Sequence, residues 1–263
     1  MSQDSIGSLP IMTLTFISNV IRSAAESGWH NVDVGGLMKN ETGLTTVVVN
    51  RHRARGLAEC RYGGDLQYRH MIYIGVGSGI AAGLYIDRQL LSGPRGGAGE
   101  IGHTTVEPDG PLCPCGNHGC LQLLSAGPAI EQEYRKTIRQ SNHTQSFTDR
   151  GIDLQLVKAQ DVCAAAENGD DLAIGVVKKA ADYLGIAMAN LLNTFNPEAI
   201  ILGGFVPNAS SLFVETAMKT MRQRAMHPLS SETVVMTSRF KEIGGALGAA
   251  NFALDKYISL SFF

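Results

Sequence analysis

Residues 99–122 read GEIGHTTVEPDGPLCPCGNHGCLQ, and this stretch holds three of the five cysteines of the chain. Cys113, Cys115 and Cys120 lie within eight positions, and His103 precedes the first of them by ten residues. Three thiolates and one imidazole form the ligand set of a closed tetrahedral zinc site. We therefore predict a structural zinc ion held by these four residues.

The glycines of this loop and a second histidine qualify the prediction. Gly110, Gly116 and Gly119 allow the sharp turns that would bring closely spaced thiols to one centre. His118 lies inside the loop and is an alternative to His103 as the fourth ligand. A redox pair, or a surface loop with incidental cysteines, stays open, because this cysteine spacing is not a common zinc-finger pattern.

Composition outside the loop is that of an ordinary globular protein. The 263 residues are 44% hydrophobic and 17% charged, and the formal net charge of −2 does not favour nucleic acid or an anionic membrane. The longest apolar stretch, 184–205, is interrupted by Asn190, Asn193 and Asn196, so we expect no membrane span. Clustered cysteines and a start without lysine or arginine indicate a reducing cytoplasm.

Strand-like and helix-like patterns alternate along the chain and predict an α/β architecture. Two buried strands on either side of GVGSG (75–79) predict a β-hairpin, and Asp161 and Asp170 are expected N-caps of two helices. We expect strands at 46–49, 71–75, 80–86, 196–204 and 233–237, and helices at 128–139, from 161, from 170, at 210–224 and at 244–257.

The cysteine loop resembles the zinc-binding signature of the ROK family, which contains sugar-sensing transcriptional repressors and bacterial sugar kinases. The wording CGNHGCL is closest to the N-acetylglucosamine repressor branch. Matching segments follow one another through nearly the whole chain: GWHNVDV (28–34), GLAE (56–59), IGVGSGIAAGLYIDRQLLSG (74–93) and NPEAIILGG (196–204). The resemblance implies the actin-like ATPase (ribonuclease H-like) fold, with two α/β lobes around a cleft.

Family members have a longer segment before the GWHNV motif, with an Asp-x-Gly turn for ATP phosphates, and the repressors add a helix-turn-helix domain. Here 27 residues precede Gly28. We therefore expect an atypical segment 1–27 and a ROK domain 28–263, which comprises the rest of an incomplete first lobe, the zinc loop 102–122 and the second lobe. The motif DVGG (33–36) only mimics the phosphate turn.

The resemblance also implies a sugar site. Glu100 and His103 match the sugar-binding glutamate and histidine of the family, and Gln122 stands where the family has a further glutamate. Asn50 and Arg51 align with an Asn-Asp pair whose aspartate is the general base of the kinases. A guanidinium has no acceptor and stays protonated, so Arg51 cannot take a proton from a sugar hydroxyl. Losing such a base costs about 10²–10⁴ in rate.

We propose from these residues that Arg51 pairs with Glu100 across the pocket. The stretch that contains Arg51, Arg53, Arg55, Arg61 and Arg69 is interpreted as a solvated surface rather than a nucleic-acid contact, because alternate residues do not share one helix face.

Two glycine turns resemble the nucleotide-binding turns of the family, and we interpret them as vestigial. The first consists of Gly77, Ser78 and Gly79, and the second of Gly203 and Gly204. A simple hairpin turn and a strand terminator are the structural alternatives.

The sequence thus favours a non-catalytic, sugar-responsive, zinc-containing domain of a ROK-type transcriptional regulator. A sugar or amino sugar would bind near Asn50, Arg51, Glu100, His103 and Gln122, and DNA would be contacted only through a domain absent from this chain. The resemblance implies a homodimer or homotetramer. The alternatives are an ATP-dependent hexose or N-acetylhexosamine kinase and a partner-dependent fragment without a ligand.

Overall fold

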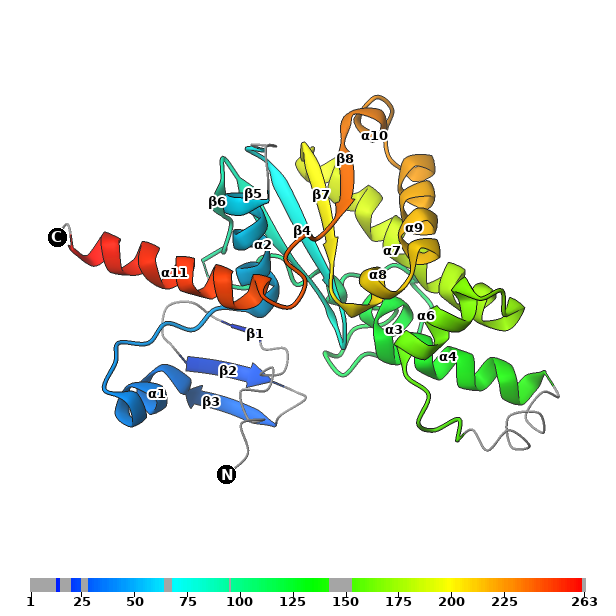
Figure 1. Ribbon diagram of the computed structural model, residues 1–263, viewed down its shortest axis with the longest axis horizontal. Helices are drawn as coiled ribbons and strands as arrows, with labels where there is room; N and C mark the ends of the chain where they lie inside the picture. Colours follow the sequence, from blue (N-terminus) through cyan, green and yellow to red (C-terminus); the bar gives the residue numbers. More distant parts are fainter. Residues whose placement is uncertain are drawn as a thin grey trace.

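A five-stranded sheet forms the centre of the protein, in the order β6–β5–β4–β7–β8, and a three-stranded sheet, β1–β2–β3, lies apart from it (Figure 1). The structure, a computed structural model, describes residues 13–14, 20–24, 28–63, 68–94, 96–141 and 153–261. Most of the segment 1–27 lies outside the described residues. The strands are β1 (Thr13–Leu14), β2 (Val20–Ala24), β3 (Trp29–Asp33), β4 (Met71–Val76), β5 (Ile80–Ile86), β6 (Gln89–Leu90), β7 (Ala199–Gly203) and β8 (Val234–Thr237).

The predicted hairpin is confirmed at the centre of the large sheet. Strands β4 and β5 pair antiparallel, with Val76 opposite Ile80 across the GVGSG turn. On its other edge β4 pairs parallel with β7, which in turn pairs parallel with β8. Because β4 and β7 run in the same direction, the turns that follow them meet at one edge of the sheet.

Every residue of β4 is buried, because helices cover both faces of the sheet. Ile72, Ile74 and Val76 belong to the larger apolar cluster, whereas Met71 and Tyr73 belong to a smaller cluster on the other face. This alternation follows from the two-residue period of a strand. It explains why MIYIGV is apolar throughout rather than at every second position.

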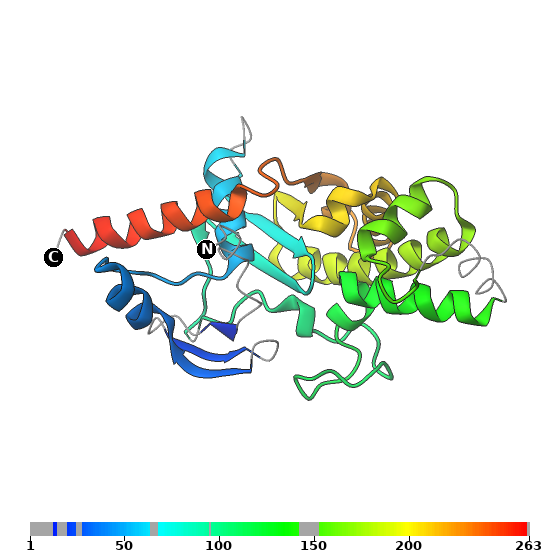
Figure 2. The same cartoon turned by 60° about the horizontal axis from the view of Figure 1, so that its bottom comes forward.

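Helices α2 and α11 cover the face of the smaller cluster, and α4, α6, α7 and α9 cover the other (Figure 1). Figure 2 shows α1 and the three-stranded sheet on the side of α11, away from α4. The helices are α1 (Val34–Thr42), α2 (Arg51–Tyr62), α3 (Gln122–Ser125), α4 (Gly127–Gln140), α6 (Ala159–Glu167), α7 (Asp171–Phe195), α8 (Phe205–Ala209), α9 (Ser211–Arg224), α10 (Leu229–Glu232) and α11 (Gly244–Ser261), with a 3₁₀ turn at Ile101–His103.

Two expectations for single elements are wrong. Residues 46–49 form no strand: Val48 packs on Ile21 in a small separate cluster, and apolar packing without a neighbouring strand leaves the segment irregular. Asp161 is not the N-cap of α6 but lies in its first turn, where its carboxylate accepts the backbone N–H of Lys158 at 2.8 Å. Asp170 does cap α7, accepting the N–H of Ala173 at 2.8 Å.

Candidate functional site

The four predicted metal ligands lie together: His103 ends the 3₁₀ turn, and the three cysteines lie in the loop between this turn and α3. Figure 2 shows this loop projecting from the molecule. Their ligand atoms all lie within 4.8 Å of one another. The Sγ atoms of Cys115 and Cys120 are 3.6 Å apart, and His103 Nδ1 is 3.7 Å from the Sγ of Cys113. A tetrahedral centre with Zn–S bonds of about 2.3 Å separates its ligands by roughly 3.7 Å. The cluster therefore fits a tetrahedral cation, and it could hold a metal ion.

Tight backbone turns bring these ligands together. Gly119 has φ +62°, and a Cβ there would collide with the Glu107 carbonyl oxygen, so the turn requires glycine. Asn117 braces the loop, since its side-chain amide donates to Thr105 Oγ1 at 2.9 Å and to the His103 carbonyl at 3.2 Å. His118 is not part of the cluster, because its Nδ1 lies 3.2 Å from the Gly110 carbonyl.

The protonation states of two ligands suit a cation. Burial lowers the pKa of His103, which leaves the imidazole neutral and able to coordinate through nitrogen. Burial raises the pKa of Cys120 to about 12. The thiolate that a metal needs would therefore be formed only with the help of the cation's own charge.

Helix α2 packs on β4 and β5, and Asn50 caps its start. The Asn50 side chain is buried, and its oxygen accepts the N–H of His52 at 2.8 Å. Arg51 follows as the first helical residue, and its Nη2 donates to Ser78 Oγ at 3.0 Å. Arg51 therefore reaches the first glycine turn rather than Glu100, and the predicted pair is wrong.

The cation that meets Glu100 is Arg53. Its guanidinium is 1% exposed, pairs with Glu100 Oε1 at 3.3 Å and donates to the Ala98 carbonyl at 2.8 Å and to the Gly96 carbonyl. The interpretation of this stretch as a solvated surface is thus wrong at Arg53. Positions 51 and 53 differ by about 200° around a helix, so they face different neighbours. Burial raises the pKa of Glu100, and Arg53 opposes that shift.

Gln122 opens α3 and lies between the 3₁₀ turn and the cysteine loop. Its Nε2 is 4.0 Å from Cys113 Sγ, and a Cβ on Gly102 would be 3.2 Å from its Oε1. The structure thus brings Glu100, His103 and Gln122 together through one short backbone turn and the cluster of His103 and the three cysteines. Arg53 connects this group to α2, which Asn50 caps.

The two glycine turns also come together, as the parallel pairing of β4 and β7 requires. A Cβ on Gly204 would be 2.2 Å from the Val76 carbonyl oxygen, and the Phe205 ring lies 3.5 Å from the position of a Cβ on Gly77. Arg51 adds its guanidinium to this edge through Ser78.

Sequence reasoning missed the role of Arg53 and the burial of His52. His52 Nδ1 is buried against Gly75 and has no hydrogen-bond partner among the described residues. Burial and the charges of Arg51 and Arg55 lower the pKa of His52 to about 3. The sequence did contain a signal for the burial of Arg53: it lies four residues before Leu57, so the two share one helix face, and an apolar leucine is expected to point inward.

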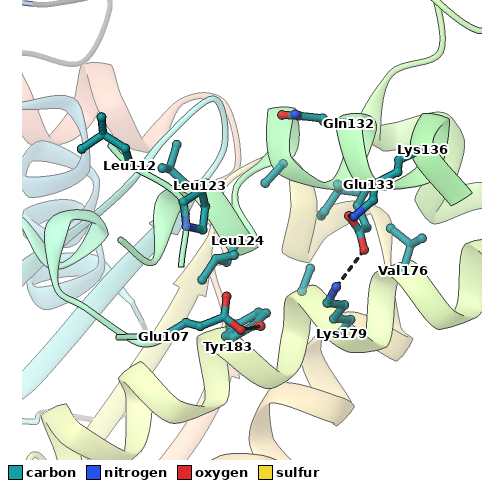
Figure 3. Close-up of a pocket in the computed structure, with 14 residues that line it drawn as sticks. Glu107, Leu112, Leu123, Leu124, Gln132, Glu133, Lys136, Val176, Lys179 and Tyr183 are labelled. Carbon is teal, nitrogen blue, oxygen red and sulfur yellow. Dashed lines mark hydrogen bonds and ion pairs between the residues drawn. The ribbon is translucent and has the colours of Figure 1, made fainter. Parts of the chain in front are cut away.

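A cavity of about 490 Å³ lies beside the cysteine loop and was not expected from the sequence (Figure 3). Leu112 of the loop and Leu123 and Leu124 of α3 line it on one side. On the opposite side, Lys179 pairs with Glu133 at 2.7 Å, and close to Leu124 the Tyr183 hydroxyl of α7 donates to Glu107 of the loop at 2.8 Å (Figure 3). One wall of this cavity therefore depends on the fold of the cysteine loop.

Comparison with known proteins identifies the family: the sequence profile of the ROK family matches residues 2–256. The chain belongs to the ROK family. Among curated relatives, the xylose repressor of Caldicellulosiruptor bescii is 28% identical over 92% of this chain and 60% of its own length. The glucokinase of Thermotoga maritima is 28% identical over 87% and 72%. The transcriptional regulator NagC of Escherichia coli is 30% identical over 83% and 52%.

Solved structures of ROK proteins confirm the fold. A ROK glucokinase of Streptomyces griseus, solved with glucose and AMPPNP, superposes with a TM-score of 0.83 at 24% identity, covering 92% of this chain and 78% of the kinase. A ROK transcriptional regulator, a homologue of the E. coli MLC protein, has a TM-score of 0.79 at 29% identity, covering 92% and 60%. The predicted α/β class and actin-like ATPase fold are thus confirmed.

The relatives include both repressors and kinases, so the family alone does not assign an activity. The chain spans about 60% of the length of the xylose repressor that it matches. Within the described part of the chain, no helix combines the length and the apolar character that a membrane span needs.

Proposed function

We propose that this chain is the sugar-responsive, non-catalytic effector domain of a ROK-type transcriptional regulator. The observation that carries the proposal is the place of Arg51. By the sequence resemblance, Arg51 takes the position of the general base of the family's kinases, and its guanidinium donates to Ser78 of the glycine turn. A permanently protonated group at this position cannot accept a proton from a sugar hydroxyl.

The sugar would bind between the start of α2 and the cysteine loop, near Asn50, Arg51, Glu100, His103 and Gln122. Glu100 would accept hydrogen bonds from sugar hydroxyls, because Arg53 holds its carboxylate in place. The Gln122 amide would add a donor and an acceptor without charge. A zinc ion on His103 and the three cysteines would fix the loop that carries these groups.

Regulation would follow by linkage: a sugar that prefers one arrangement of subunits or lobes shifts the equilibrium toward it. We assign DNA binding to a further domain of the regulator and expect a homodimer or homotetramer in the cytoplasm. The glycine turns at Gly77–Gly79 and Gly203–Gly204 would then be structural remnants of nucleotide binding.

A calorimetric titration without ATP tests the proposal. Zinc-loaded protein is titrated with glucose, N-acetylglucosamine, N-acetylmannosamine and xylose, and we expect saturable binding of one of them. Glu100→Gln should weaken that binding at least tenfold, whereas Glu215→Gln, an exposed change on α9, should not alter it. No binding of any sugar would contradict the proposal and favour a chain without a ligand.

The kinase alternative is favoured by the glucokinases among the relatives. It predicts sugar-dependent ADP formation with Mg-ATP. We expect none from this chain, and turnover that disappears in Arg51→Ala would show that our argument from Arg51 is wrong.

A further inference from the structure

A second cavity, of about 440 Å³, lies between α2, α11 and the chain that follows β5. Its size is in the range of small-molecule sites. Leu57, Leu90, Pro94 and Phe252 give it an apolar floor. The predicted metal ligands and the predicted sugar-binding residues are not part of its lining.

The charged lining of this cavity is mainly cationic. Arg61, Arg88 and Lys256 line it together with a single carboxylate, Asp255, which leaves a formal surplus of two positive charges. Asp255 binds Arg61 through both oxygens, at 2.6 and 2.7 Å. The Lys256 ammonium lies 5.8 Å from the centre of the Phe252 ring, so one cation borders the apolar floor.

Arg88 reaches the cavity from a strained turn. It has φ +64°, and Asp87 before it has φ +48°, in the tight turn between β5 and β6. Two-residue hairpin turns of this kind favour Asn-Gly, because a Cβ is disfavoured at positive φ. Strained backbone concentrates at functional sites, and here the strain places a guanidinium at the cavity.

We propose that this cavity binds a small organic phosphate. A phosphate monoester carries close to two negative charges at neutral pH, which matches the surplus of the lining. Guanidinium and ammonium groups recognise phosphate oxygens, and the apolar floor would take an aromatic or aliphatic part of the ligand. This binding claim does not depend on the proposed function.

The site is connected to Glu100 through one face of α2. Arg53, Leu57 and Arg61 follow one another at four-residue spacing, so they lie in a row along the helix. Leu57 and Arg61 line the cavity, and Arg53 holds both Glu100 and the carbonyl of Gly96, which is itself a lining residue. A ligand that contacts Gly96 would therefore alter the position of Glu100, and this coupling rests on the proposed function.

Titration of the zinc-loaded full chain with phenyl phosphate tests the binding site. We expect saturable binding at least tenfold tighter than that of inorganic phosphate, since only the former fills the apolar floor. The double variant Arg88→Gly/Lys256→Ala should lose at least tenfold in affinity, and glycine at position 88 keeps the positive-φ backbone. The control Lys219→Ala/Arg224→Ala removes the same charge from α9 and should bind as the unchanged protein does.

No saturable binding of phenyl phosphate, or an equal loss of affinity in the control pair, would overturn the site. For the coupling, the sugar titration is repeated with saturating phenyl phosphate, and we expect at least a threefold change in the Kd of the sugar. An unchanged Kd would overturn the coupling. Phenyl phosphate binding without any sugar binding would contradict the proposed function and leave the phosphate site intact.

Discussion

Arg53 and Glu100 form the least solvent-exposed ion pair among the described residues, with side chains 1% and 17% exposed. A charge in such a place is tolerated only with a partner, and removing one member leaves the other uncompensated. Arg53 also satisfies two carbonyls of the chain that leads to Glu100. Its contribution is therefore to shape the site, whatever ligand the site takes.

We expect Arg53→Met to lower the free energy of unfolding by about 3 kcal/mol, since it leaves the buried Glu100 carboxylate and two carbonyl groups without their partner. Arg51→Ala, two residues earlier, should cost less, about 1 kcal/mol, because its hydrogen bonds to the exposed Ser78 hydroxyl at 3.0 Å and to His52 Nε2 at 3.4 Å leave no buried charge without a partner when they are lost. Denaturant unfolding of both variants measures the difference. Equal losses would contradict the assignment of Arg53 to the buried pair.

His52 makes stability depend on pH. Its pKa is about 3 in the folded protein, against 6.5 for an ordinary histidine, so only the unfolded chain takes up a proton between these values. Stability is therefore fully present above pH 6.5 and is lost as the pH falls below it, by up to about 1.4 kcal/mol per pH unit. Denaturant unfolding at pH 7 and pH 5 measures this loss, and His52→Gln should reduce it. The same loss in the variant would refute a neutral buried His52.

At the scale of elements, Glu167 joins the end of α6 to the start of α9. Its carboxylate accepts from Ser210 Oγ at 2.8 Å, from Ser211 Oγ at 2.9 Å and from the N–H of Leu212 at 2.9 Å. These hydrogen bonds hold the pKa of Glu167 below its ordinary value, with the Leu212 N–H making the largest contribution. A negative charge at a helix N-terminus is also favoured by the helix dipole.

Glu167→Gln should cost about 1 kcal/mol at neutral pH, because the amide keeps an acceptor but loses the charge. The sign follows from the lowered pKa: the contribution is present above the ordinary glutamate value and is lost as the pH falls through the folded value. Unfolding at pH 7 and pH 3 measures it, with Glu215→Gln on α9 as the control. A difference that persists unchanged at pH 3 would exclude this origin.

Elements with strong local signals were predictable. Asp170 correctly predicted the start of α7, and the glycine turn between two apolar runs correctly predicted the β4–β5 hairpin. The expected strand at 46–49 failed because a strand needs a neighbouring strand, which a β-branched run does not specify. The Asp161 cap failed by three positions, because an acidic residue in the first turn gives the same sequence signal as a cap.

In the candidate site, too, features set by local sequence were predictable and features set by packing between distant segments were not. The gathering of His103, Cys113, Cys115 and Cys120 was predictable because short spacing and glycine turns act within one loop. The partner of Glu100 was not, because it depends on how α2 is rotated against a loop more than forty residues away. Choosing between Arg51 and Arg53 required the packed helix.

For the whole molecule, the cysteine loop is where a bound metal would act on stability. We expect zinc to raise the free energy of unfolding by about 2.7 kcal/mol when its free concentration is a hundred times Kd. Thermal unfolding with and without a chelator measures this effect. Cys115→Ser should unfold at the lower temperature and be insensitive to the chelator, whereas Cys60→Ser should respond as the unchanged protein does. No response to chelation would contradict the metal site.

The position of β4 at the centre of the sheet has a consequence for the chain as it is made. Strands β4 and β5 can pair as soon as both emerge from the ribosome, but the other edge of β4 must wait for β7, which begins only at Ala199. At about 5–20 residues per second, the apolar edge of MIYIGV stays open for roughly 6–25 s. An open apolar edge is a template for pairing with other chains. The nascent protein is therefore most prone to aggregation until residues 199–203 have been synthesised.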